Sequence, residues 1–106
     1  MFKKNLYITR GIDESIPKPV INILWNLIHQ DEGKRELDYL QVFVLKTIGT
    51  RDGKSLWIRW TQEQPEYSLD VYFPDITIDI DTKVWVICSG EGSEEEYSTM
   101  LLPEEY

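Results

Sequence analysis

Apolar residues between Val20 and Ile28 recur at the spacing of one helix face. Positions 20, 21, 24, 27 and 28 are apolar, which is the periodicity of an amphipathic helix, and positions 23 and 25 widen the stripe. Pro17 and Pro19 stand at its entry and Gly33 follows it. Proline is tolerated in a first turn, and glycine suits a C-terminal cap. The pattern predicts one helix that ends near Asp31.

Most of the remaining chain has runs of strand length, rich in β-branched and aromatic residues. Turn signals separate them at positions 49–54, 63–66 and Pro74-Asp75. We therefore predict a single α+β domain over residues 1–106, with one N-terminal amphipathic helix packed on one face of an antiparallel sheet of about five strands. The expected strands after the helix are Asp38–Thr47, Leu56–Gln62, Tyr67–Phe73, Ile76–Asp81 and Lys83–Ser89. A short strand, Leu6–Thr9, precedes the helix, and Ser98–Leu102 is the candidate for a short last strand.

The hairpin around positions 63–66 predicts which side chains share a face. A turn that pairs position 60 with 67 or 69 leaves the same parity, and a one-residue slip would exchange the two faces. Leu56, Ile58 and Trp60 should therefore face the helix together with the apolar side chains at 67, 69, 71 and 73. The opposite face collects Trp57, Arg59, Ser68, Asp70 and Tyr72. This second face is expected to be exposed, closed over by curling, or covered by another chain.

Charge is divided unevenly along the sequence. Residues 1–60 carry a net charge of +3, whereas residues 61–106 carry −11, which together give the overall −8. If the second half folds into one region, Asp70, Asp79, Asp81 and the acidic run 91–96 should form a continuous acidic surface. Such a surface repels phosphates and attracts basic proteins. We therefore expect an unidentified basic protein partner, no nucleic acid and no membrane, and a homo-oligomer is compatible with the pattern.

Nothing in the chain resembles a targeting or membrane segment. The N-terminal ten residues lack an apolar run of signal-peptide length, and no stretch approaches the ~20 apolar residues of a membrane span. The single cysteine, Cys88, excludes an intramolecular disulfide. A cytoplasmic location is the expectation.

Candidate chemistry is sparse. His29 has no neighbouring nucleophile signature and is expected to be solvated, and Cys88 is expected to be a buried core thiol. One histidine and one cysteine cannot form a Cys/His zinc site, and no glycine-rich phosphate loop is present. We therefore predict no catalytic residue, no metal site and no cofactor. Asp70, Asp79 and Asp81 remain open as hard-cation ligands or acid–base groups, although a charged outer face is the ordinary interpretation.

Three residues on the second sheet face stand out. Trp57, Arg59 and Tyr72 combine two aromatic rings with a guanidinium group, a set that occurs at the centres of protein interfaces and on single-strand nucleic acid binders. Plain cross-strand pairing is the third interpretation. The net negative charge disfavours nucleic acid, because phosphate contacts supply much of that affinity.

Four segments together resemble a family of small proteins of unknown function, first grouped from staphylococci and also seen in other Gram-positive bacteria and their mobile elements. They are 7–12 (YITRGI), 37–43 (LDYLQVF), 62–65 (QEQP) and 98–106 (STMLLPEEY). The resemblance covers nearly the whole chain. It implies a bacterial, cytoplasmic, single-domain protein and carries no activity or catalytic residue. A mobile-element setting favours a small regulator or inhibitor of a host protein.

These observations lead to one functional expectation with two alternatives. The expectation is a non-enzymatic protein-interaction module, including mimicry of nucleic acid towards a basic partner, with Trp57, Arg59, Asp70, Tyr72, Asp79 and Asp81 as candidate contact residues. The first alternative is a small carboxylate- or metal-dependent enzyme that uses Asp70, Asp79 and Asp81. The second is a single-strand nucleic acid binder that uses Trp57, Arg59 and Tyr72.

Overall fold

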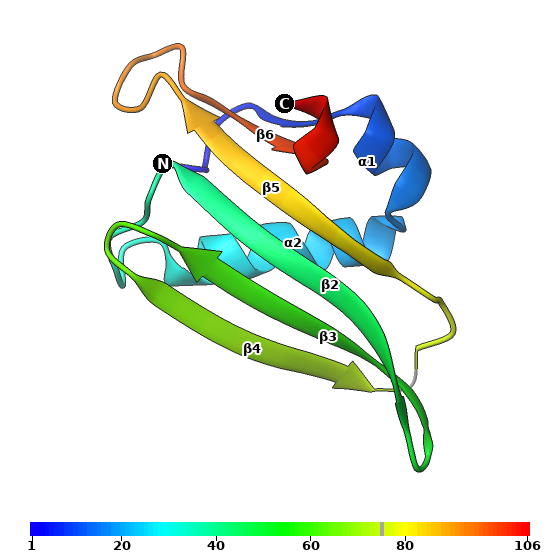
Figure 1. Ribbon diagram of the computed structural model, residues 1–106. Helices are drawn as coiled ribbons and strands as arrows, with labels where there is room; N and C mark the ends of the chain where they lie inside the picture. Colours follow the sequence, from blue (N-terminus) through cyan, green and yellow to red (C-terminus); the bar gives the residue numbers. More distant parts are fainter. Residues whose placement is uncertain (75) are drawn as a thin grey trace.

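One long helix lies across one face of a six-stranded sheet (Figure 1). The structure is a computed structural model that describes residues 1–74 and 76–106. The strand order is β1-β6-β5-β2-β3-β4, with β1 parallel to β6 and every other pair antiparallel. The elements are β1 (Leu6–Ile8), α1 (Arg10–Ser15), α2 (Lys18–Asp31), β2 (Leu40–Thr50), β3 (Gly53–Gln62), β4 (Tyr67–Pro74), β5 (Asp81–Ser89), β6 (Tyr97–Leu101) and the 3₁₀ helix η1 (Pro103–Glu105).

The α+β class is confirmed, and the strand count and pairing are corrected. The sheet has six strands rather than about five, and it is mixed because the N-terminal strand β1 lies parallel beside β6. A second helix, α1, was not predicted. Thr9 caps it by accepting a hydrogen bond from the backbone N–H of Ile12, which is completely buried. Six residues are too few for periodicity to show.

Helix α2 matches its apolar pattern. Its buried side chains fall on the predicted stripe, Pro19 lies in its first turn, and Gly33 follows it at φ +81°, a left-handed conformation that glycine adopts without strain. The stripe joins the helix-facing residues of the sheet in one hydrophobic core cluster. Leu24 and Trp60 are both completely buried there.

The β3–β4 hairpin has the predicted parity. Trp60 pairs with Leu69, Ile58 with Val71 and Leu56 with Phe73, so both apolar rows face α2. The β3 residues of this row are fully buried, whereas those of β4 are half-buried. The opposite face carries Trp57 beside Tyr72 and Arg59 beside Asp70, as expected.

The predicted strand Ile76–Asp81 is wrong, because only Asp81 belongs to a strand. The alternation itself is present: the three isoleucines are half-buried, and Thr77 and Asp79 are exposed. The backbone of this segment bonds partly to a side chain instead of a neighbouring strand. The Thr47 hydroxyl donates to the Ile78 carbonyl (3.0 Å) and accepts from the Ile80 N–H (2.9 Å). The Pro74-Asp75 turn signal extends to Asp75, which lies outside the described residues.

The topology mixes the two halves of the sequence. Three strand pairs, β1–β6, β5–β2 and β3–β4, each join a strand from the basic half to one from the acidic half. At the ends of the chain, Lys3 and Lys4 line a hollow together with Glu94 and Glu96. No helix among residues 1–74 and 76–106 has the length and apolar content needed to cross a membrane.

Candidate functional site

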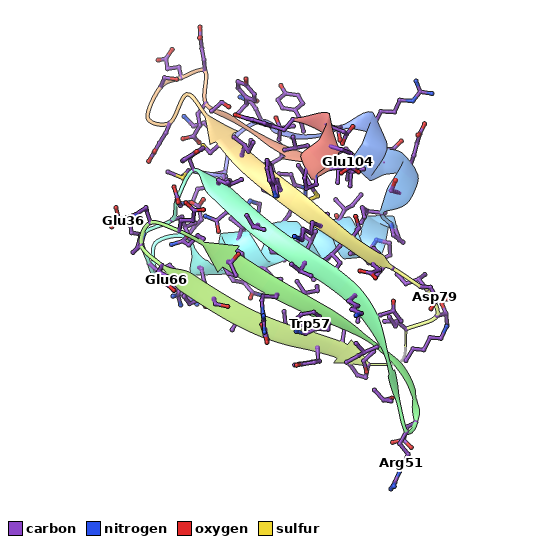
Figure 2. All side chains as sticks on the ribbon, viewed as in Figure 1. Glu36, Arg51, Trp57, Glu66, Asp79 and Glu104 are labelled. Atoms are coloured by element: carbon purple, nitrogen blue, oxygen red, sulfur yellow. The ribbon has the colours of Figure 1, made fainter. Side chains whose placement is uncertain are left out.

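Two aromatic side chains lie side by side on the sheet face that points away from α2. Trp57 lies on β3 (Figure 2). It is directly opposite Tyr72 on β4, which is 59% exposed. Neighbouring side chains of a sheet face bind a partner as one surface, because directly opposite Cβ atoms are only ~5 Å apart. The half-buried Trp57 and the exposed Tyr72 therefore form an aromatic patch on this sheet face, which we call the open face.

An ion pair borders these aromatic rings. Arg59 donates from Nε to Asp70 Oδ1 (2.9 Å) and from Nη2 to Asp70 Oδ2 (3.1 Å), and its guanidinium carbon lies 5.0 Å from the centre of the Trp57 ring. The hydrogen bond and charge of Arg59 lower the pKa of Asp70, and Asp70 raises the pKa of Arg59 in turn. A bidentate pair holds both side chains in one orientation, so the surface beside Trp57 is preorganised.

The other two predicted site residues lie elsewhere. Asp81, the first residue of β5, is opposite Lys46 of β2, which is opposite Trp57. Asp79 lies just before the first residue of β5 (Figure 2). It forms an ion pair with Lys54 (Nζ to Oδ1, 2.8 Å). Of the six candidate residues, five share the open face and Asp79 stands apart at its end.

The expected continuous acidic surface does not form from these residues. Each of the three aspartates faces a cation, and the acidic run 91–96 follows the last residue of β5, whereas Asp81 is the first. A strand of nine residues spans ~30 Å, about three Debye lengths at physiological salt. At these three aspartates, the negative charge of the second half of the sequence is therefore offset locally by cations of the first half.

The same geometry separates the carboxylates that an enzyme would need. Strands β2 and β3 lie between Asp81 on β5 and Asp70 on β4, a distance of ~14 Å at ~4.8 Å per strand. Across the part of the chain that the structure describes, no three His, Cys, Asp or Glu side chains gather as metal ligands would. Asp70 and Asp81 are therefore too far apart to bind one cation together.

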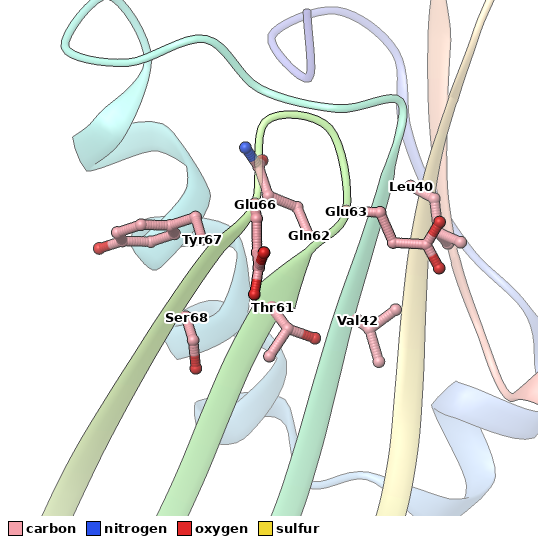
Figure 3. Close-up of a pocket in the computed structure, with 8 residues that line it drawn as sticks. All are labelled: Leu40, Val42, Thr61, Gln62, Glu63, Glu66, Tyr67 and Ser68. Carbon is pink, nitrogen blue, oxygen red and sulfur yellow. The ribbon is translucent and has the colours of Figure 1, made fainter.

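An open hollow lies at the end of the open face nearest the β3–β4 turn, where the Arg59–Asp70 pair separates it from Trp57 and Tyr72. Its volume is about 520 Å³. Figure 3 shows the residues that line it. Leu40, Val42 and Thr61 lie in its floor, and Glu63 and Glu66 reach over it from the turn. Among residues 1–74 and 76–106, neither glutamate has a partner in an ion pair. An apolar floor under two carboxylates matches the stem and the charged end of a lysine or arginine side chain.

The sequence interpretation did not include this part of the face. Strands β2 and β5 carry apolar residues on both sides: Phe43 and Val84 face the core, while Val42 and Trp85 pair on the open face. The signal was present as unbroken apolar runs at 42–45 and 84–88, because strands that are apolar on both sides do not alternate. The Tyr106 ring packs edge-on against Trp85 with centroids 5.7 Å apart and covers this corner.

His29 and Cys88 have structural surroundings. His29 is half-buried rather than solvated: Nε2 donates to the Phe2 carbonyl (2.6 Å), and the ring stacks on Trp25. The stripe could not reveal this contact, because Phe2 is distant in sequence. Cys88 is buried in the core cluster, as predicted.

Comparison with family models matches residues 5–105 to a family described as "Staphylococcal protein of unknown function (DUF960)". The chain belongs to this family. The resemblance inferred from the sequence motifs is thereby confirmed. The DUF960 chain is also similar to a solved structure titled "Crystal structure of the protein of unknown function from Enterococcus faecalis", with a TM-score of 0.74 and 17% identity over 99% of this chain and 94% of that one. At this identity the likeness shows the fold alone. The comparison with curated proteins finds no match.

Proposed function

We propose that this DUF960 protein is a non-enzymatic protein-interaction module that binds a basic protein through the open face. The observation that carries the proposal is that one sheet face holds both the Trp57–Tyr72 pair and, four residues further along the same strands, the hollow under Glu63 and Glu66. Trp, Tyr and Arg are the residues that dominate binding energy at interface centres. All three types are present here on a rigid sheet.

The hollow gives the partner a chemical character. A lysine or arginine of the partner would lay its aliphatic stem over Leu40 and Val42 and place its charge beside Glu63 and Glu66. The aromatic rings would then cover the apolar part of the contact. The net charge of −8 supports the same partner at longer range, because it accelerates encounter with a basic protein.

The proposal is tested by capturing partners from a staphylococcal lysate on four immobilised proteins. These are the wild type, the double variant W57A/Y72A, the double variant E63Q/E66Q, and Tyr39→Ala as the control. Tyr39 is 57% exposed and directly precedes β2. The open-face residues of β2 stand at even positions, so Tyr39 does not belong to that row. The captured protein is then purified, and its dissociation constant is measured for each variant at low and high salt.

We expect the wild type and the control to bind one basic protein equally well. W57A/Y72A should weaken binding at least ~10-fold, the equivalent of ~1.4 kcal/mol, because it removes two large contact residues. E63Q/E66Q should slow association and reduce its salt dependence. Equal binding by all four proteins would exclude the open face. Capture of nucleic acid that a nuclease removes would favour the single-strand binder instead.

A further inference from the structure

Strand β4 is an unpaired edge of the sheet. It pairs with β3 on one side only, over the eight residues Tyr67–Pro74 (Figure 1). Apart from the β3 ladder, its backbone groups make no hydrogen bond to any residue at positions 1–74 or 76–106. A row of free N–H and C=O groups on an extended strand is a template for another strand.

The edge lacks the features by which natural sheets prevent such pairing. The register with β3 runs without a bulge, no lysine lies on the strand, and its one proline is its last residue. Its single charged side chain, Asp70, points to the open face and is already paired with Arg59. Nothing within the strand repels an incoming backbone.

The helix side of the edge is also incompletely covered. Leu69, Val71 and Phe73 are half-buried, although the residues opposite them on β3 are completely buried. Phe73 also lines an apolar hollow of about 240 Å³ with Ile23 of α2. Additional apolar side chains on this side would complete the core at the edge.

We propose that a second copy of this chain binds here, so that two β4 strands pair antiparallel about a twofold axis at Val71. Opposite residues of an antiparallel pair point to the same face, so the helix-facing row must meet its own copy. With Val71 opposite Val71 of the second copy, Leu69 meets Phe73 and the whole segment 68–74 is paired. The two sheets would continue as one, with both α2 helices on the same side.

Side-chain charge selects this register. Moving the axis to Asp70 would place two aspartates directly opposite each other, which is destabilising. Moving it to Leu69 would leave only residues 67–71 of the strand paired. With the axis at Val71, Asp70 is opposite Tyr72 and no like charges meet. Two chains of −8 still repel at long range, so the dimer should strengthen as salt screens the repulsion.

Disulfide trapping tests the register. In Val71→Cys the two introduced thiols lie across the axis with Cα atoms ~4.5–5.5 Å apart, within disulfide range. In Leu69→Cys the two thiols are four residues apart along the strands, ~14 Å, and cannot bond. Cys88 is buried and is present in both variants, so it does not distinguish them. We expect mild oxidation to yield a covalent dimer of V71C and little of L69C. Equal yields, or a higher yield for L69C, would overturn the proposal.

Sedimentation tests the association without introduced thiols. The wild type should change from monomer to dimer between about 10 and about 300 μM, and more readily at about 500 mM than at about 50 mM salt. Val71→Lys should weaken the dimer at least ~10-fold, because two like charges would then meet at the axis, while Val71→Thr should keep it. Monomers at every concentration and salt would overturn the proposal. The proposed partner binding is separate, since V71K leaves the open face unchanged and partner binding should weaken with salt.

Discussion

Replacing Gln41 with leucine should destabilise the fold more than the same replacement at an exposed glutamine. The Gln41 amide is completely buried and connects three groups. Its Oε1 accepts from the Trp60 indole N–H, and its Nε2 donates to the Asp38 carbonyl (2.8 Å) and to Gln62 Oε1 (2.9 Å). Gln41→Leu keeps a similar volume and removes all three bonds.

The magnitude follows from the groups left behind. Gln62 Oε1 keeps its bond from the Asp38 N–H (3.1 Å), so the main loss is at Trp60. A buried donor without an acceptor costs about 1–3 kcal/mol, and the half-buried Asp38 carbonyl adds a smaller amount. The expected loss is ~2–4 kcal/mol in the free energy of unfolding. For a chain of this length that lowers Tm by roughly 10 °C or more.

A double-mutant cycle separates this cause from general disruption. Urea unfolding followed by circular dichroism is measured for Q41L, W60F and Q41L/W60F, with Gln30→Leu on the exposed side of α2 as the control. The double variant removes both partners of the Trp60–Gln41 bond. Its loss should therefore be smaller than the two single losses combined, by about 1–2 kcal/mol. Additive losses, or a Q41L loss no larger than the control's ~0.5 kcal/mol, would refute the reasoning.

Three further outcomes are expected. Leu24→Ala should lower the free energy of unfolding by ~2–5 kcal/mol, because it leaves a cavity in place of a completely buried side chain. A loss near zero in urea unfolding would contradict the core described above. Cys88 should react slowly with a thiol reagent in the native state because it is buried, and stoichiometric labelling within minutes would disprove this. Hydrogen bonds from Thr9, Leu102 and Gly11 lower the pKa of Glu105, so its stabilising contribution is complete above the unfolded pKa and is lost as pH falls through the folded pKa. Glu105→Gln should flatten the decline of Tm between neutral pH and about pH 3. An unchanged decline would count against a stabilising role for these hydrogen bonds to Glu105.

The sequence predicted the parts of the fold that depend on local periodicity. The α2 stripe and the two faces of the β3–β4 hairpin follow from side-chain spacing alone, because a slip by one residue would expose Trp60. The segment 76–81 shows the limit of such reasoning. Its alternation correctly indicates which side chains are half-buried, but its backbone bonds to Thr47 and Lys54, which are more than 20 residues earlier.

The candidate site was predicted only in part, for the same reason. Trp57, Arg59, Asp70 and Tyr72 lie within one hairpin, so their shared face could be read from parity. The hollow needs β2 beside β3 and the turn glutamates above Val42, and strand order is not encoded in the spacing of residues. The failed acidic surface has a local and a long-range cause, since Arg59 reaches Asp70 within the β3–β4 hairpin and Lys54 reaches Asp79 from 25 positions away.

The pairing of β1 with β6 determines when this sheet can be completed. Thr9 at the end of β1 hydrogen-bonds Glu105, 96 positions later, so the first strand has no partner until β6 has left the ribosome. Until then the edge of β5 that pairs with β6 has no partner strand. Contacts between residues so distant in sequence also slow folding. Synthesis therefore passes through a state in which an apolar strand, 84–88, has an exposed edge. A chain shortened before β6 should stay in that state and aggregate, which makes the last ten residues a requirement for soluble expression.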